Sequence, residues 1–376
     1  MGILRRAGIA AAAVLASLGL AYRFALAYRV RAGFPRRQAP TITPPDMGLA
    51  YESMAIVSDG VSLPAWFIPA RGGARGPGVV LVHGWESARD RTLPLALFLN
   101  AAGFHCLTFD VRGNGANPPE ELPLSAGEFG RDALAAFRAL IDQPEVSVGA
   151  IVGHSMGGVG SLLAAAADPR VAAVVATSTP AGPYRLTRLT FRLARLPIPD
   201  VIAYPLAWLT TRVYLRPRGH LVDDVSAVAA IARYDGPVLL AHGDQDTVVP
   251  VSHLERLAAT GRAARLDEPD AGPIETTVVR DGQHSWLYED AGYRRTVAAF
   301  LARSLGGPYE PDEAGELAAR TETRRLPDAE TRFAGTVVTP GGFRTLASVA
   351  LPGATRRLPE AEPGSGPNET TSEVAS

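Results

Sequence analysis

Lysine is absent from the sequence, so every one of its 37 Lys or Arg residues is an arginine. These are balanced by 38 acidic residues, which leaves a formal net charge of −1 at pH 7. Proteins that bind nucleic acid need a strongly basic face, and a chain with balanced charge does not suggest one. We therefore expect no nucleic-acid partner, and we interpret the missing lysine as compositional bias rather than as a functional signal.

Cysteine is almost as scarce, because Cys106 is the single cysteine in the sequence. No disulfide framework can form within one chain. Cys106 lies in an apolar run typical of a buried strand, where a free cysteine packs as a small hydrophobe. Hydrophobic residues make up 47% of the 376 residues, which is enough for a sizeable core in one large α/β domain with appendages, or in two small domains.

One long apolar run lies near the amino terminus. Residues 7–28 are almost wholly apolar apart from Arg23, and a pair of arginines precedes them. A helix of about 20 apolar residues spans a bilayer, and the long side chain of Arg23 can reach the interface. We predict an uncleaved single-span membrane anchor within residues 1–37. A cleaved signal peptide is the alternative, because Ala25-Leu26-Ala27 resembles a cleavage site. Arginines flank both ends, so the side of the membrane is undetermined.

The segments that flank the central region differ from it in composition. Residues 38–48 are rich in proline and threonine and are predicted to be a linker. Residues 306–376 are rich in Gly, Pro, Glu, Thr and Arg, lack sustained periodicity, and are predicted to be a largely disordered tail. The tail holds a short repeat, residues 323–330 and 355–362, to which we assign no role. A globular domain is therefore expected over residues 49–305.

The domain is predicted to begin with a hairpin and to continue as alternating strands and helices. Asp59-Gly60 separates two apolar runs, and such a pair favours a tight turn between strands. Continuous apolar runs then alternate with helical stretches, which predicts a mostly parallel sheet with helices on both faces. In such sheets the active site lies at the carboxyl ends of the strands. The predicted strands cover residues 78–82, 104–109, 148–152, 171–176, 237–241 and 276–279, and the predicted helices cover 93–102, 126–140, 159–167 and 252–259.

Residues 180–236 interrupt this rhythm and are predicted to form a helical cap over the strand ends. Within them, arginines and leucines recur at spacings of three and four residues, which on a helix form adjacent basic and apolar stripes. Two interpretations stay open, an ordinary solvated face and a basic amphipathic helix resting on an anionic membrane surface. The stripes comprise Arg185, Arg188, Arg192 and Arg195, and Leu186, Leu189, Leu193 and Leu196.

An apolar run that starts at Ala150 ends abruptly in Gly153-His154-Ser155-Met156-Gly157. This pattern predicts a strand, a sharp turn and a helix, with the Ser155 hydroxyl held where a substrate carbonyl can approach. Gly153 and Gly157 permit the turn because neither brings a Cβ atom into the space between strand and helix. In the alternative, Ser155 merely caps the helix that follows.

Nucleophilic serine catalysis also needs a base, an acid and oxyanion donors. His284 follows the last predicted strand and is the expected base. The loop after residue 241 offers Asp244 and Asp246, and we favour Asp246 because it lies further into the loop. The backbone N–H groups of Met156 and Trp85 are the expected oxyanion donors.

Together these motifs resemble the α/β-hydrolase superfamily over residues 49–305, most closely its serine aminopeptidase and monoacylglycerol-lipase-like branch. The resemblance implies an α/β-hydrolase fold, a Ser155, Asp246 and His284 triad, and no cofactor. One departure is Asn114, where relatives usually carry a small residue or a histidine. The matching motifs are His83-Gly84, the loop 110–115, the serine turn 153–157, the acid loop 242–246 and the base loop 282–284.

Other polar residues give weaker signals. His220 with Asp223 and Asp224 is a conceivable metal-ligand set, but three polar residues on a cap loop are usually solvated, so no metal site is predicted. Pro118 replaces the third glycine of a dinucleotide fingerprint, which argues against a nucleotide cofactor. His83, His154 and His242 are interpreted as structural, and the sequence reveals no partners for His105 and His253.

We therefore predict a membrane-anchored serine hydrolase that cleaves an ester, thioester or amide bond of an apolar acyl substrate. The predicted membrane anchor favours a substrate derived from lipid. Two alternatives stay open. One is an aminopeptidase-like peptidase, in which Glu86 or Asp90 would hold a substrate amine. The other is a non-catalytic membrane-anchored scaffold. The sequence specifies neither the physiological substrate nor the oligomeric state.

Overall fold

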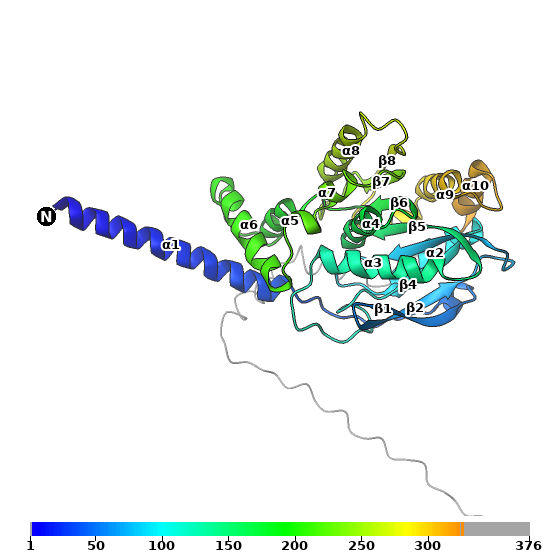
Figure 1. Ribbon diagram of the computed structural model, residues 1–376, viewed down its shortest axis with the longest axis horizontal. Helices are drawn as coiled ribbons and strands as arrows, with labels where there is room; N and C mark the ends of the chain where they lie inside the picture. Colours follow the sequence, from blue (N-terminus) through cyan, green and yellow to red (C-terminus); the bar gives the residue numbers. More distant parts are fainter. Residues whose placement is uncertain (1, 324, 327–376) are drawn as a thin grey trace, which may run out of the picture.

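The computed structural model describes residues 2–323, 325 and 326, and its centre is one eight-stranded sheet (Figure 1). The strand order across the sheet is β1-β2-β4-β3-β5-β6-β7-β8. Strands β3 to β8 pair in parallel, whereas β1 and β2 pair antiparallel. The strands are β1 (Glu52–Ser58), β2 (Val61–Ile68), β3 (Gly76–Val82), β4 (His105–Phe109), β5 (Val146–His154), β6 (Val171–Thr177), β7 (Val238–Gly243) and β8 (Ile274–Val279).

The predicted hairpin and the mostly parallel sheet are confirmed. Asp59 and Gly60 have φ angles of 48° and 79° in the turn between β1 and β2, as a tight hairpin turn requires. Within β3, alternate residues face opposite sides of the sheet, so Val80 packs in one core cluster and Leu81 in the other. Both faces of the central strands are therefore buried, which explains their continuous apolar sequences.

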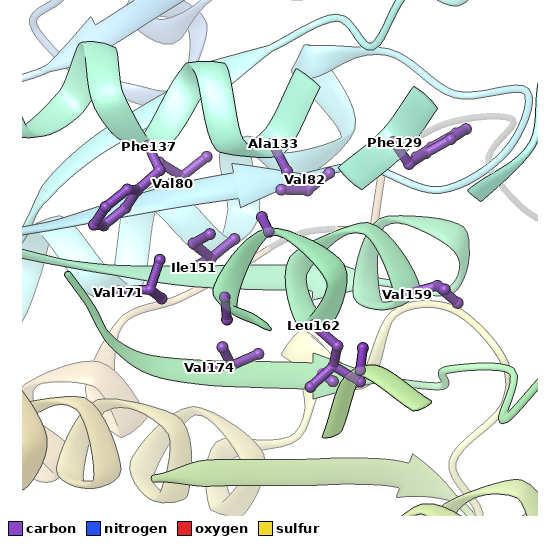
Figure 2. Close-up of a cluster of buried hydrophobic side chains, with 14 of the residues drawn as sticks. Val80, Val82, Phe129, Ala133, Phe137, Ile151, Val159, Leu162, Val171 and Val174 are labelled. Atoms are coloured by element: carbon purple, nitrogen blue, oxygen red, sulfur yellow. The ribbon is translucent and has the colours of Figure 1, made fainter. Parts of the chain in front are cut away.

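Helices cover both faces, as predicted. On one face, α3 (Ala126–Ile141), α4 (Met156–Ala167), α7 (Ala227–Ile231) and α8 (Ser252–Ala264) contribute to one core cluster. Figure 2 shows part of it, with Phe129 and Phe137 of α3 and Leu162 of α4 packed over β3, β5 and β6. On the other face lie α2 (Leu93–Ala101), α9 (Ala291–Leu305) and α10 (Pro311–Arg320). Short 3-10 turns occur at Pro44–Met47, Arg89–Thr92, Arg216–Arg218, Asp223–Val225 and Leu287–Glu289.

Helix α3 illustrates how the sequence sets an element's start. The Ser125 hydroxyl accepts a hydrogen bond from the Gly127 N–H at 3.2 Å, and the Glu128 carboxylate accepts one from the Ser125 N–H at 2.7 Å. This reciprocal cap satisfies backbone donors that the first helical turn leaves without partners. A cap of this kind stabilises a helix by about 1 kcal/mol.

The amino-terminal helix α1 (Gly2–Ala32) is longer than the predicted span of residues 7–28. The stretch Ile3–Ala32 is long and apolar enough to cross a membrane, and only 6% of its most apolar window is buried. A core helix of a soluble protein would be mostly buried, so that interpretation does not fit. Near its carboxyl end α1 packs on the cap, where the Phe24 and Phe191 rings meet edge to face at 5.5 Å.

The predictions for two flanking segments need correction. The predicted linker 38–48 is bound to the domain, because the Thr41 N–H and hydroxyl both donate to Asp90 Oδ2, at 2.7 and 3.1 Å. The predicted disordered tail begins with helix α10, whose Ala314 and Ala318 are fully buried against α9 and α2. Leu326 is also buried. The rest of the tail, including most of the first copy of the repeat and all of the second, lies outside the described residues.

The insertion between β6 and β7 forms the expected cap, made of α5 (Pro183–Leu193) and α6 (Asp200–Leu215) (Figure 1). The prediction that one helix carries the stripes through residue 196 is wrong. Helix α5 ends at Leu193, and Arg195 has a φ of 47° in the loop that follows. The buried residues of α5 are Thr187 and Phe191 rather than the leucines, because the helix packs against α1 and α6.

Candidate active site

The turn between β5 and α4 carries Ser155 at the carboxyl edge of the sheet. Its backbone has φ 54° and ψ −118°, a conformation that residues with a Cβ atom seldom adopt. The Ser155 N–H donates to the Thr177 carbonyl of the neighbouring strand at 2.8 Å, which fixes the turn to the sheet. The Ser155 side chain accepts no hydrogen bond from the first turn of α4, so the interpretation as a helix cap does not fit.

Close backbone contacts explain both glycines of the turn. A Cβ atom on Gly153 would lie 2.3 Å from the Gly157 carbonyl oxygen, and one on Gly157 would lie 2.3 Å from the Val82 carbonyl oxygen. Because backbone atoms cannot move aside as a flexible side chain can, any larger residue here would displace strand or helix. The strained serine is therefore held by tight packing on both sides.

The predicted acid and base lie in contact on neighbouring loops. The ring nitrogen Nδ1 of His284 donates to Asp246 Oδ2 at 2.8 Å, and both residues are buried. Since Nδ1 carries the proton, Nε2 is the nitrogen that acts as acceptor in the neutral ring. Asp244, the other carboxylate that the sequence offers, is exposed.

The Asp246 carboxylate is surrounded by donors. Its Oδ1 accepts from the N–H groups of Val248 and Val249, at 2.9 and 2.8 Å. Its Oδ2 lies 3.2 Å from His242 Nε2 in addition to His284. Burial alone would raise the pKa of Asp246, but the hydrogen bonds from His242 and His284 outweigh burial and hold the pKa well below its usual range. The carboxylate is therefore ionised at neutral pH, as a partner for an imidazolium must be.

Ser155 and His284 are linked through His154. The His154 ring donates from Nε2 to the His284 carbonyl at 2.8 Å, and the two imidazole rings lie 4.9 Å apart. Burial, and then the charge of His284, lowers the pKa of His154 to about 4, so this ring is neutral at pH 7. His154, the residue before Ser155, therefore fixes the base loop beside the serine turn. The sequence suggested only a structural histidine here, because its partner lies 130 residues away.

The loop after β3 runs directly beside Ser155. A Cβ atom built on Gly84 would lie 3.4 Å from the Ser155 Cβ, so the backbone of Gly84, the residue before Trp85, approaches the serine closely. The Trp85 ring stacks on Phe129 with 6.2 Å between centroids. On the other side of the serine, Met156 is the first residue of α4, and the N–H groups of a first helical turn have no partner within the helix.

Asn114, the departure from the family pattern, supports this loop. Its Oδ1 accepts from the Glu86 N–H at 3.2 Å, and its Nδ2 donates to the Arg112 carbonyl at 3.1 Å. Glu86 follows Trp85 and has a φ of 52°, a conformation that needs support in a residue with a side chain. Sequence reasoning recognised Asn114 as unusual but did not identify this contact.

The acidic residues proposed to hold a substrate amine have other partners. Asp90 is buried and accepts the two hydrogen bonds from Thr41. Glu86 accepts from the Arg36 N–H at 3.1 Å. Both contacts tie the segment after α1 to the domain.

The remaining histidines have structural partners. His83 accepts from the Val111 N–H at 3.0 Å, and burial lowers its pKa. The sequence revealed no partners for His105 and His253, yet His105 accepts from the Ala70 N–H and His253 accepts from the Ala181 N–H, at 3.0 and 2.9 Å. Such contacts with backbone groups leave no signal in residue spacing.

His220 pairs with a carboxylate rather than lying in a metal site. Its Nε2 lies 2.8 Å from Glu128 Oε1, while Asp224 accepts from the Leu221 N–H. Burial would raise the pKa of Glu128, but the contact with His220 and the charge of Arg218 hold it at about 2. Among the residues that the structure describes, no group of three or more His, Cys, Asp or Glu side chains is arranged to hold a metal ion.

Known proteins share this fold. The uncharacterized protein Rv2307c of Mycobacterium tuberculosis is 31% identical over 205 residues, which cover 54% of this chain and 63% of that protein. The mitochondrial palmitoyl-protein thioesterase ABHD10 of Homo sapiens is 31% identical over 110 residues, which cover 28% of this chain and 35% of that protein. The matches thus span less than two thirds of these relatives. The esterase Pf2001 of Pyrococcus furiosus superposes with a TM-score of 0.57 at 22% identity, covering 73% of this chain and 98% of that one.

The family match covers the whole site described above. The model of the alpha/beta hydrolase family matches residues 79–299, more than half of the chain. This range runs from β3 to α9 and includes the serine turn, the acid loop and the base loop. The chain therefore belongs to the α/β-hydrolase family.

Proposed function

We propose that this protein is a membrane-anchored serine hydrolase that cleaves an ester, thioester or amide bond of an apolar acyl substrate through a covalent acyl-enzyme. The contact between His284 Nδ1 and Asp246 Oδ2 at 2.8 Å carries this proposal. It joins two loops at the edge of the sheet where Ser155 stands in a strained turn. A buried histidine that is hydrogen-bonded to a buried carboxylate, at the same edge of the sheet as a serine in a strained turn, is typical of enzymes that transfer acyl groups.

In the proposed mechanism, the Ser155 hydroxyl attacks the acyl carbonyl carbon while His284 Nε2 takes its proton. Asp246 holds the imidazole in the tautomer with the proton on Nδ1 and stabilises the imidazolium that forms. The tetrahedral intermediate then collapses, and the imidazolium gives its proton to the leaving oxygen, sulfur or nitrogen. Water repeats the sequence on the acyl-enzyme and releases the acid.

The oxyanion of the intermediate would accept hydrogen bonds from the N–H groups of Met156 and Trp85. The close approach of Gly84 to Ser155 supports the assignment of Trp85, and the position of Met156 at the start of α4 supports the other donor. Removing one such donor typically costs about 3 kcal/mol of transition-state stabilisation.

Three observations support an apolar acyl substrate. The apolar helix α1 ends on the cap, and the cap exposes apolar side chains of α6, including Val201 and Trp208. A relative over part of the chain is a palmitoyl-protein thioesterase. The peptidase alternative is weakened, because Asp90 is buried under Thr41 and unavailable to a substrate amine.

Exchanging each of the two loop carboxylates tests the acid. Asp246→Asn keeps the shape but removes the charge that supports His284, so we expect turnover of a soluble ester to fall by about 10³-fold to 10⁴-fold. Asp244→Asn is the matched control on the same loop and should leave turnover within about twofold, because that side chain is exposed. Loss of turnover in the Asp244 variant alone would contradict the assignment.

Extraction from membranes tests the anchor. The side chains of α1 are exposed from residue 3 to residue 20, so the full chain should remain in the pellet after alkaline carbonate treatment. Leu15→Arg with Leu18→Arg places two charges in the span at a cost of about 3 kcal/mol each. This double variant should become extractable. A wild-type chain released by carbonate or by high salt would contradict a membrane span.

A further inference from the structure

A cavity of about 190 Å³ lies in the cap, between α5, α6 and the start of α8. Three arginines of α5 line it, namely Arg185, Arg188 and Arg192. Their spacing of three and four residues places them on one face of the helix. Neither the predicted triad nor the predicted oxyanion donors line this cavity.

The positive charge of the cavity is only weakly compensated. Within the described part of the chain, no carboxylate oxygen lies within 4.0 Å, the limit for an ion pair, of a guanidinium nitrogen of Arg185 or Arg188. Arg192 lies 3.2 Å from Asp200, but these side chains are 57% and 62% exposed. Such surface pairs contribute about 0–1 kcal/mol, so Arg192 can turn to another anion at little cost.

Two further residues of the cavity support the binding of an anion, His253 through its neutral ring and Tyr204 through its contact with Arg188. His253 accepts from the Ala181 N–H through Nδ1, so its own proton lies on Nε2. Burial and the nearby Arg185 lower the pKa of His253 to about 4, which keeps the ring neutral at pH 7. The Arg188 guanidinium lies over the Tyr204 ring at 4.2 Å, which restricts its orientation. A planar guanidinium held in this way matches the paired oxygens of a phosphate group.

The surroundings of the cavity indicate where the anion comes from. Figure 1 shows α5 and α6 beside the carboxyl end of α1. Helix α6 exposes Val201 and Trp208 at 81% and 51%, and the Arg212 guanidinium lies over the Trp208 ring at 3.8 Å. Aromatic and arginine side chains of this kind are typical of the interface between a bilayer and water, where lipid phosphates lie.

We propose that the cap cavity binds the phosphate group of an anionic phospholipid through Arg185, Arg188 and Arg192. The phosphate site follows from the arginines and does not depend on the proposed hydrolysis. The choice of a lipid over free phosphate rests on the proposed membrane anchor. Binding here would hold the cap on the membrane surface, with α5 and α6 at the level of the head groups.

Calorimetric titration of the full chain in non-ionic detergent tests the proposal. The probes are dihexanoyl-phosphatidylglycerol, its phosphatidylcholine counterpart and inorganic phosphate. We expect phosphatidylglycerol to bind most tightly, because choline adds a positive charge and inorganic phosphate lacks apolar chains. The variant Arg185→Gln with Arg188→Gln should weaken phosphatidylglycerol binding by at least tenfold. The control Arg216→Gln with Arg233→Gln removes the same charge from exposed cap residues outside the cavity and should bind like the wild type.

Two results would each overturn one part of the proposal, either the binding site or the lipid as the source of the phosphate. Equal phosphatidylglycerol affinity in the cavity variant and the control variant would overturn the site. Inorganic phosphate that binds as tightly as the lipid, and is lost in the cavity variant, would overturn the lipid as its source. Turnover of a soluble ester in the same samples checks that the variants are folded and should not change. Absence of turnover in the wild type would overturn the proposed hydrolysis and leave the binding result intact.

Discussion

At the scale of single residues, Asn114 connects two loops of the candidate site. Its fully buried side chain joins the Arg112 carbonyl to the N–H of Glu86, the residue after Trp85. If Trp85 is an oxyanion donor, Asn114 sets the position of that donor without touching substrate. We regard it as a positioning residue, whose effect should appear in the chemical step more than in substrate binding.

We expect Asn114→Ala to lower kcat about tenfold with little change in KM, because an oxyanion donor that shifts stabilises the transition state less. Asn117→Ala is the matched control, since Asn117 is buried in the same loop but donates to the carbonyls of Asp110 and Val111. Steady-state kinetics and thermal melts of both variants provide the readout. Equal losses of kcat and of thermal stability in the two variants would mean that Asn114 is only structural.

At the scale of elements, α10 is a part of the fold that was predicted as disorder. The guanidinium of Arg294 on α9 donates to the carbonyls of Ala318 and Ala319, at 3.1 and 2.7 Å, and thus satisfies the carboxyl end of α10. The buried face of α10 consists of alanine and glycine, which bring the two helices close together. The helix covers only ten residues of a segment rich in Gly, Pro, Glu, Thr and Arg, so the composition of the whole segment masked it in the sequence.

Ala318→Asp should therefore destabilise the whole domain. An unpaired charge at a fully buried position costs about 3 kcal/mol or more, which corresponds to a fall of several degrees in Tm for a chain of this size. Arg320→Asp introduces the same side chain at an exposed position of the same helix and should change Tm little. Similar melting temperatures for the two variants would show that α10 is not packed as described.

The elements that position the site were more predictable than the contacts within it. Strands β3 and β5 were predicted within two residues of their ends, because continuous apolar runs reflect burial on both faces. The serine turn and the loops of Asp246 and His284 follow from their places at strand ends. The roles of His154 and Asn114 depend on partners distant in sequence, which spacing along a single chain does not encode.

At the scale of the whole molecule, buried histidines make stability depend on pH. Burial lowers the pKa of both His154 and His253 to about 4, below the ordinary value of 6.5. Between about pH 4 and 6.5 the unfolded chain therefore binds more protons than the folded chain does. By linkage, stability is fully present above pH 6.5 and is lost as the pH falls towards 4.

We expect the free energy of unfolding to fall by about 2 kcal/mol per buried histidine between pH 7 and pH 5. Thermal melts at pH 7, 6 and 5 measure this loss. His253→Gln removes one of the titrating groups and should reduce the dependence on pH, whatever its effect at pH 7. A variant whose stability falls with pH as steeply as that of the wild type would contradict burial of a neutral His253.

The central claim for the whole molecule is that the fold holds Ser155 as a reactive nucleophile. Labelling of the full folded chain with a fluorophosphonate probe, followed by peptide mass spectrometry, tests it most directly. We predict a covalent adduct on Ser155, none in Ser155→Ala, and unchanged labelling in Ser304→Ala, whose hydroxyl donates to the Phe300 carbonyl on α9. Folded wild-type protein without an adduct, or an adduct that persists in Ser155→Ala, would contradict the account.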